Sequence, residues 1–282
     1  MRIKITADST CDLSEELLAQ WDIALMPMHI LMGEDSYLDG VTIHPADVFA
    51  YVNAGGKMPK SAAANLVEYT EFFEPFAKEC DAVIHISVSS KLSSCYQNAK
   101  LAAEDFANVY VVDSGTAAIG TGILAEYALT CIDRGMDAAA LVRELTEKRE
   151  DVCVLALVDT LEYLKRGGRI SKTTALAGGL LNIKPVLTIE KGEILLIGKA
   201  RGSRQGNNLL VEKIRACGGI DFQLPILLGY TGLTDVFLKK YVEDSRALWE
   251  NGADGLESTL IGGVIGTHAG PGAIAVAFFR RG

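Results

Sequence analysis

"AVIHISVSSKLSSCYQNAKLAAEDF" (residues 82–106) holds the pattern that decides the fold. Its first seven residues form an apolar, β-branched run of the kind that makes a buried strand. From Cys95 onward the apolar spacing is that of an amphipathic helix. Four serines, a lysine and a leucine lie between the two runs, so hydroxyl groups gather where a strand ends and a helix begins. The stretch therefore predicts a strand–loop–helix unit with a polar junction.

The same alternation of strand and helix runs through the first half of the chain. Apolar runs at residues 2–8, 81–88 and 109–114 predict strands, and each precedes a helical pattern. Pro45 suits the first turn of a helix that Gly55 closes. Such alternation predicts a mostly parallel sheet covered by helices on both faces. We expect the helices at residues 13–21, 45–56, 66–80, 95–106, 120–135 and 137–150.

Near residue 150 the pattern changes. A buried strand is predicted at 152–158, and a helix that ends at Gly167-Gly168 follows it. The run 184–202 predicts a β-hairpin that turns at "EKGE". Further helices are expected at 203–217 and 233–250, and further strands at 225–230 and 272–279.

Two closely packed domains follow from these patterns. They are an α/β domain over residues 1–155 and an α+β domain over 156–282, with an approximate boundary across which segments can exchange. A ligand tunnel is expected at or near the crevice between the two domains.

Composition excludes several classes of protein. The 282 residues carry a net charge of −9 with a pI near 5.0, which argues against a nucleic-acid-binding surface. None of the six cysteines forms a C-x-x-C pair, so a zinc site is not expected. The first residues, "MRIKITADST", predict a strand and a turn, so we expect no secretory leader, and no apolar run reaches the roughly 18 residues of a membrane helix. A soluble, cytoplasmic protein with mostly buried thiols is expected.

Two serines and a histidine are candidates for binding an anion. Ser93 and Ser61 each precede a predicted helix, where free N–H groups and the helix dipole attract negative charge. Each serine could equally be an N-cap with no further role. His268 lies among five glycines in "GGVIGTHAGPG", a loop that could admit a ligand or simply turn into the last strand.

Two basic segments stand out in this acidic chain. Residues 165–172 carry Lys165, Arg166, Arg169 and Lys172, and residues 199–204 carry Lys199, Arg201 and Arg204. Charge runs are usually solvated faces. Here the two basic segments lie at glycine-bounded turns of an acidic chain, which favours a role in docking a partner or contacting an anion.

The motifs of several enzyme classes are missing. No G-x-S-x-G elbow supports Ser93 as a nucleophile with His268 as its base. No phosphate-binding loop, dinucleotide fingerprint or metal cluster is present. Asp8 and Asp12 could hold a metal, but a cap and a turn are commoner uses of aspartates at such a junction. The residues alone therefore indicate a small anionic ligand in a domain crevice.

Taken together, seven stretches resemble the DegV family. They follow in order along almost the whole chain. The stretches are "ADSTCDL" (7–13), "SSKLSSCYQNA" (89–99), "VVDS" (111–114), "YLKRGGRIS" (163–171), "KPVL" (184–187), "GKARG" (198–202) and "IGTHAGPGAIAV" (265–276). The resemblance implies two α/β domains that hold a long-chain fatty acid in a tunnel. It further implies a subunit of a bacterial fatty acid kinase, which presents the acyl carboxylate to a separate ATP-dependent kinase protein that makes acyl phosphate for phospholipid synthesis.

The resemblance also implies roles for individual residues. Ser61, where threonine is more usual, Ser93 and His268 match the groups that hold the carboxylate. Arg201 matches a hairpin arginine of that site, with Arg204 as the fallback. Arg166 and Arg169 match a turn that meets the kinase. No catalytic residue, metal or cofactor is implied in this chain.

The sequence departs from the family pattern in its first loop, and three other functions remain possible interpretations. The first loop reads Ser61-Ala62-Ala63-Ala64-Asn65 where relatives tend to read T-S-Q-P-S, which makes this loop less polar. A carrier of another apolar carboxylic acid, a serine-dependent hydrolase and a regulatory module without a ligand are the alternative functions.

Overall fold

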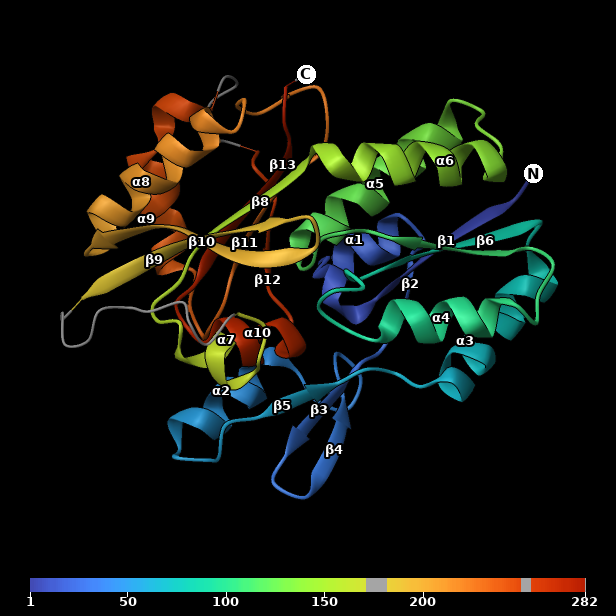
Figure 1. The fold of residues 1–282 in the computed structure, drawn as a ribbon, viewed down its shortest axis with the longest axis horizontal. Helices are drawn as coiled ribbons and strands as arrows, with labels where there is room; N and C mark the ends of the chain where they lie inside the picture. Colours follow the sequence, from blue (N-terminus) through green and yellow to red (C-terminus); the bar gives the residue numbers. More distant parts are fainter. Residues whose placement is uncertain (171–181, 250–254, 282) are drawn as a thin grey trace.

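The computed structural model describes residues 1–170, 182–249 and 255–281. Ser171 and Lys172 of the predicted basic turn lie outside these ranges. A four-stranded parallel sheet with the strand order β2-β1-β6-β7 organises the first half of the chain (Figure 1). Its strands are β1 (Ile3–Asp8), β2 (Ala24–Met26), β6 (Ala82–Ser87) and β7 (Val109–Asp113).

Helices cover both faces of the parallel sheet, as the alternating pattern predicts. All six residues of β6 are buried, because a central strand of such a sheet has no solvent-facing side. On one face α3 and α4 pack over Val83 of β6, and on the other α1, α5 and α6 pack over Ile84. These helices are α1 (Glu15–Gln20), α3 (Leu66–Glu79), α4 (Cys95–Ala103), α5 (Ile119–Asp133) and α6 (Ala138–Lys148).

A second, mixed sheet organises the rest of the chain. Its strand order is β10-β9-β8-β13-β11-β12, and only the β11–β12 pair is parallel. Its strands are β8 (Val152–Leu157), β9 (Ile183–Glu190), β10 (Glu193–Arg201), β11 (Ile226–Tyr230), β12 (Ser258–Leu260) and β13 (Ile274–Phe279). The predicted boundary at residues 155/156 falls inside β8, whose six residues all belong to this sheet.

Helices and a hairpin complete the second sheet. β9 and β10 form the predicted hairpin, and Lys191 and Gly192 turn between them with positive φ angles of 50° and 82°. The predicted helix before the double glycine is short and ends at Arg166. The helices of this part are α7 (Glu162–Arg166), α8 (Ser203–Ala216), α9 (Val236–Asp244) and α10 (Gly263–Ala269).

A small antiparallel sheet from the first half of the chain packs against the second half. It has the order β4-β3-β5, with α2 beside it (Figure 1). α10 packs against α2, β3 and β5, so residues 29–62 and 263–269 meet across more than 200 positions of sequence. The elements are β3 (His29–Met32), β4 (Asp35–Leu38), α2 (Pro45–Asn53) and β5 (Lys60–Ala62).

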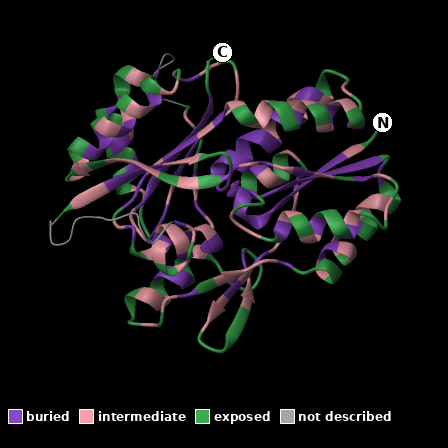
Figure 2. Ribbon diagram, viewed as in Figure 1, coloured by how far each residue is buried: buried purple, intermediate pink, exposed green. Residues whose placement is uncertain are grey.

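Helix α5 lies between the two larger sheets and packs against both of them. It contacts β1 and β6 of the parallel sheet and β8, β11 and β13 of the mixed sheet. Gly120 and Gly122 make this fit possible: a Cβ atom would lie 2.4 Å from Val154 Cγ2 at the first and 2.7 Å from the Cys11 carbonyl at the second. Buried residues accordingly run from one sheet through α5 to the other (Figure 2).

Candidate ligand-binding site

A narrow apolar cavity lies where the two sheets meet. One side is formed by loops that follow β1, β6 and β7, which contribute Thr10, Leu92 and Ala117. The carboxyl ends of parallel strands are the usual place for a ligand in an open α/β sheet. The other side is formed by β8, β9, β10 and α10. The apolar residues on that side are Val154, Ala156, Val158, Leu187, Ile189, Ile194, Val264, Ile265 and Ala269. The cavity has a volume of about 110 Å³.

Polar side chains gather at one region of this apolar wall. Ser61, Ser93, Arg169 and His268 all line the cavity, although they come from four separate parts of the chain. Three of the four predicted carboxylate-binding residues are thus brought together. Ser61, Arg169 and His268 also line a second, outer pocket that includes the exposed Lys60 and Arg166, so they stand between the apolar cavity and the protein surface.

Ser61 is not the helix cap that its sequence context suggests. It lies in β5, paired with Ile30 of β3, and its Oγ is 2.8 Å from His268 Nε2. The N-cap of the following helix is Asn65, whose Oδ1 accepts hydrogen bonds from Val67 N and Glu68 N. The polar Asn65 at the end of the first loop therefore does the capping, which leaves the Ser61 hydroxyl to the cavity.

Ser93 is not the N-cap of α4, which is Ser94, but it hydrogen-bonds the start of that helix and lines the cavity. Its Oγ accepts a hydrogen bond from the backbone N–H of Cys95 at 3.3 Å, in the first turn of α4, and donates one to Cys95 Sγ at 3.2 Å. The neighbouring Ser89 has a different role, because its Oγ donates to the carbonyl of Gly192 in the β9–β10 hairpin. The serines after β6 thus both shape the junction and line the cavity.

His268 lies in a helix rather than in the expected loop. The glycines before it let α10 pack closely: a Cβ at Gly263 would lie 2.6 Å from Ile30 Cδ1, and one at Gly266 would lie 2.9 Å from Phe49 Cζ. These glycines therefore allow close packing of α10 and do not expose its backbone to a ligand. Burial, together with the positive charge of Arg169, lowers the pKa of His268 to about 4, so the imidazole is neutral at physiological pH.

The arginine at the cavity is Arg169 and not Arg201. Arg201 ends β10 with an exposed side chain, and neither it nor Arg204 is among the residues that line the cavity. Arg169 is half-buried: its Nε donates to the carbonyl of Leu92 at 3.1 Å and one terminal nitrogen donates to that of Gly167 at 2.7 Å. The sequence could not separate these arginines, because only the tertiary fold brings the turn after α7 against the loop of Ser93.

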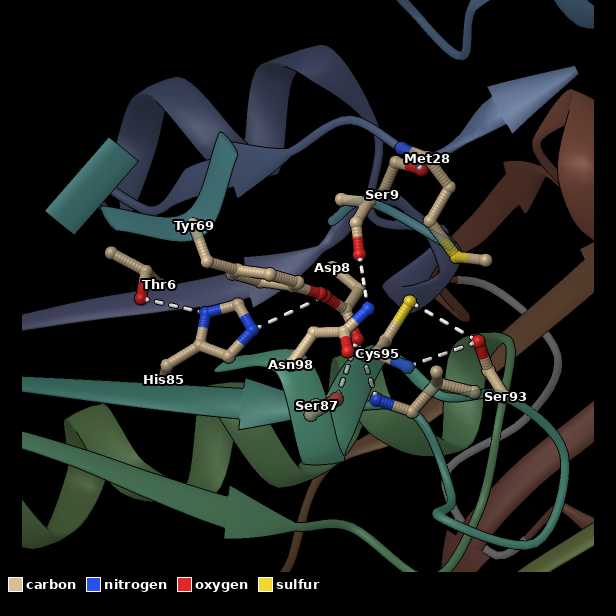
Figure 3. A network of polar contacts seen from close by, with 12 residues as sticks. Thr6, Asp8, Ser9, Met28, Tyr69, His85, Ser87, Ser93, Cys95 and Asn98 are labelled. Atoms are coloured by element: carbon tan, nitrogen blue, oxygen red, sulfur yellow. Dashed lines mark hydrogen bonds and ion pairs between the residues drawn. The ribbon is translucent and has the colours of Figure 1, made fainter. Parts of the chain in front are cut away.

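A buried polar network behind Ser93 was not predicted from the sequence. Asp8 accepts hydrogen bonds from Tyr69 Oη, from Ser87 Oγ at 2.8 Å and from Val88 N at 2.9 Å, and His85 Nε2 lies 3.1 Å away (Figure 3). Burial alone would raise the pKa of Asp8, but the hydrogen bonds and the charge of His85 hold it below its ordinary value. The sequence signals were an aspartate at the end of β1 and a histidine within the mostly apolar run of β6.

This network is connected to the cavity through Cys95. Cys95 accepts from Ser93 and is a hydrogen-bond neighbour of Tyr69, which donates to Asp8. Figure 3 shows Ser93 and Cys95 at one end of the group and His85 with Thr6 at the other. The network thereby fixes the start of α4 relative to β1 and β6. Within residues 1–170, 182–249 and 255–281, no cluster of three or more His, Cys, Asp or Glu side chains is placed to hold a metal.

The fold and the cavity define a class of α/β protein with two large sheets that enclose an apolar ligand site ending in hydroxyl, imidazole and guanidinium groups. The chain belongs to the DegV family, as the resemblance predicted. The family model described as "Uncharacterised protein, DegV family" matches residues 2–281. A DegV domain-containing protein of Caldanaerobacter subterraneus is 33% identical over 289 residues, which covers 99% of both chains.

Solved structures agree over the full chain. A DegV family protein from Thermus thermophilus, described by its fatty acid binding, superimposes with a TM-score of 0.88 at 30% identity, covering 99% of this chain and 100% of that one. A stearic acid-binding protein from Eubacterium ventriosum gives a TM-score of 0.87 at 26% identity, with 99% and 98% covered. The two-domain α/β fold predicted from the sequence is thereby confirmed.

Proposed function

We propose that this protein binds a long-chain fatty acid and presents its carboxylate to a separate ATP-dependent fatty acid kinase. The observation that carries the proposal is the apolar cavity with Ser61, Ser93, Arg169 and His268 at its polar region. The fatty-acid-binding relatives of the same fold support it. Since the partner uses ATP, the proposal also places the protein in the cytoplasm.

The acyl chain supplies most of the binding free energy. Each buried CH₂ contributes roughly 0.8 kcal/mol, so about sixteen carbons give tight binding after the cost of ordering the chain. A carboxylate is costly to bury unless several donors meet it. Arg169 provides a charge, and the Ser61 hydroxyl provides a donor that does not titrate near neutral pH. The Ser93 hydroxyl provides a second donor when it turns from Cys95 Sγ to the ligand.

His268 acts by orienting Ser61. A neutral imidazole carries one N–H, and His268 Nδ1 is buried without a hydrogen-bond partner. When Nε2 holds the proton, it donates to Ser61 Oγ, and the Ser61 hydroxyl is free to donate to the ligand. Gly167 permits this placement, because a Cβ there would lie 2.2 Å from Nδ1. In this account the residues hold the carboxylate, and the phosphoryl chemistry belongs to the kinase.

The outer pocket is the surface that we assign to the kinase. Lys60 and Arg166 line it together with Ser61, Arg169 and His268, so a basic surface surrounds the polar end of the ligand. Arg166 is exposed and pairs with Glu162 at 2.7 Å one helical turn away. Exposed charges of this kind set encounter rate and salt dependence more than affinity.

Native mass spectrometry of the protein purified from bacterial cells tests the proposal directly. We expect a bound straight-chain fatty acid, and no acyl phosphate when the pure protein is given ATP and Mg²⁺ alone. A cyclic or polar metabolite as the retained ligand, or turnover without a partner, would contradict the proposal.

Ser93→Ala is expected to weaken fatty-acid binding about tenfold or more, since a hydrogen bond to a charged group contributes roughly 1.5–3 kcal/mol. Isothermal titration with a long-chain acid measures the change. Ser94→Ala is the matched control, because Ser94 is exposed beside Ser93 and its side chain makes no capping hydrogen bond. If Ser93→Ala and Ser94→Ala bind the fatty acid with equal affinity, Ser93 does not contact the carboxylate.

Arg169 and Arg166 are expected to separate ligand binding from kinase contact. Arg169→Ala should lower fatty-acid affinity about tenfold or more, because a half-buried guanidinium at the cavity is lost. Arg166→Ala should keep affinity within about twofold, since exposed charge pairs contribute little. The same Arg166 variant should reduce acyl phosphate output with the kinase, most clearly at low salt. Equal losses of affinity in both variants would refute this division of roles.

A serine hydrolase stays the second candidate because Ser61 Oγ lies 2.8 Å from His268 Nε2. Against it, no carboxylate of the residues that the structure describes hydrogen-bonds to His268 Nδ1 to orient the imidazole as a base. Labelling of Ser61 by a fluorophosphonate, with loss of label in His268→Ala, would favour this function instead.

A further inference from the structure

Cys153 and Cys217 lie together although 63 residues separate them in the sequence. Cys153 is on β8, and Cys217 caps the end of α8, which packs against β8. Cys217 Sγ donates a hydrogen bond to the carbonyl oxygen of Ile214 at 3.2 Å. Both cysteines pack against the same apolar cluster and line the same cleft, and each thiol is the main influence on the pKa of the other, so the two are close neighbours.

Both thiols face a space that reagents can enter. They line a polar cleft with a volume of about 710 Å³, which adjoins the apolar cavity at Thr188 and Ile189 of β9. The side chains of Cys153 and Cys217 are partly exposed there. The other four cysteines, Cys11, Cys80, Cys95 and Cys131, are buried. The fold thus separates two accessible thiols from four enclosed ones.

The two thiols differ in their readiness to lose a proton. The hydrogen bond from Cys153, aided by backbone N–H groups and the charge of Arg280, lowers the pKa of Cys217 to about 7. The same hydrogen bond, together with burial, raises the pKa of Cys153. Arg280 is held in place by the Glu150 carbonyl and by Asp151. A partly exposed thiolate beside a protonated thiol is the arrangement of an attacking cysteine and a resolving cysteine.

We propose that Cys153 and Cys217 are a redox-active pair that closes to a reversible disulfide when the protein meets a hydroperoxide. The Cys217 thiolate attacks the peroxide O–O bond, takes one oxygen as a sulfenic acid and releases hydroxide. Cys153 Sγ then attacks that sulfur, the S–S bond forms, and the expelled hydroxide leaves as water with the Cys153 proton. Two thiols are oxidised and hydrogen peroxide is reduced to water; a small dithiol reverses the reaction.

The disulfide would join β8 to the end of α8 behind the acyl cavity. Val154 and Ala156, which line that cavity, alternate along β8 with Cys153 and Leu155, which line the polar cleft. Oxidation would therefore crosslink β8 to α8 on the face of the strand that lines the polar cleft. The opposite face of the same strand lines the apolar cavity. A link that closes so long a loop should raise Tm by several degrees, on the order of 5 °C.

Peptide mapping of the full-length protein tests the pair. The reduced protein is treated with hydrogen peroxide, alkylated, and digested with trypsin without reduction. We expect residues 150–165 and 216–239 to appear joined, two hydrogen atoms lighter than their sum. Thiols counted in denaturant should fall from six to four and return to six after dithiothreitol.

Two serine variants assign the roles. Cys153→Ser should trap a sulfenic acid at Cys217 that reacts with dimedone, whereas Cys217→Ser should consume peroxide at least about tenfold more slowly. Links between two molecules, links that involve the four enclosed cysteines, or oxidation that stops at Cys217 in the wild type would overturn the proposal. The peptide map of the wild-type protein decides whether the disulfide forms even where a variant fails to fold.

Discussion

Ala156→Phe is expected to bind long-chain fatty acids at least about 100-fold more weakly than the natural protein. Ala156 is in the middle of β8, the third strand of a six-stranded sheet, and it is only partly buried because part of its surface lines the cavity. A phenyl ring there would fill the space of about four methylenes. Their loss amounts to roughly 3 kcal/mol, which corresponds to this change in affinity.

The cavity itself gives the variant room, so the fold should survive the larger side chain. Unchanged or higher Tm together with lost binding, measured by displacement of a fluorescent fatty acid, would show a blocked site and not an unfolded one. Ala139→Phe, at an exposed position of α6, is the control and should bind normally. Full affinity of Ala156→Phe for a long-chain acid would mean that the acyl chain lies elsewhere.

Asp8→Ala is expected to destabilise the protein by about 3–5 kcal/mol, because it leaves His85 and Tyr69 buried without their shared acceptor. A loss of this size lowers Tm on the order of 10 °C. Asp22→Asn is the control: Asp22 pairs with Lys4 at 2.7 Å but its side chain is 79% exposed, and asparagine tolerates the positive φ of 49° and keeps an acceptor oxygen, so about 1 kcal/mol or less should be lost. Asp8→Asn, which keeps one acceptor oxygen, should fall between the two. Similar losses in the Asp8 and Asp22 variants would contradict a stabilising network.

The pH dependence of this loss has a definite sign. The folded-state pKa of Asp8 lies below the ordinary value of 3.8, so the carboxylate stabilises the fold at every pH well above that value. The contribution disappears as the pH falls through the lowered pKa. The stability difference between Asp8→Ala and the natural protein should therefore be constant from about pH 8 to pH 5 and shrink in stronger acid.

Local signals in the sequence identified most elements of the fold. Pro45 opens α2, Gly55 follows its end with a φ of 87°, and Lys191-Gly192 makes the hairpin turn, because such signals depend on neighbouring residues alone. The domain boundary has no such local signal and stays a prediction. Nothing local in "VCVLALV" tells that β8 pairs with β13, more than 100 residues further on.

The site was predicted in part for the same reason. Ser61, Ser93 and His268 meet at one cavity, but the sequence placed Ser61 at a helix start and His268 in a loop. The sequence predicted Arg201 at the cavity, whereas the structure places Arg169 there. Which of the two basic turns reaches the loop of Ser93 depends on the tertiary packing alone. Periodicity likewise gave no sign that Asp8 and His85 would meet across neighbouring strands.

The position of α5 bears on how a ligand enters and leaves. Two lobes that touch only along a crevice can swing apart about a hinge. Here α5 is packed into both sheets, and ten of its residues are buried. Opening the two lobes about a hinge would separate α5 from one of the two sheets and expose its apolar surface to water. We therefore expect a single cooperative unfolding transition, with ligand exchange through small movements of α7 and β5 at the mouth.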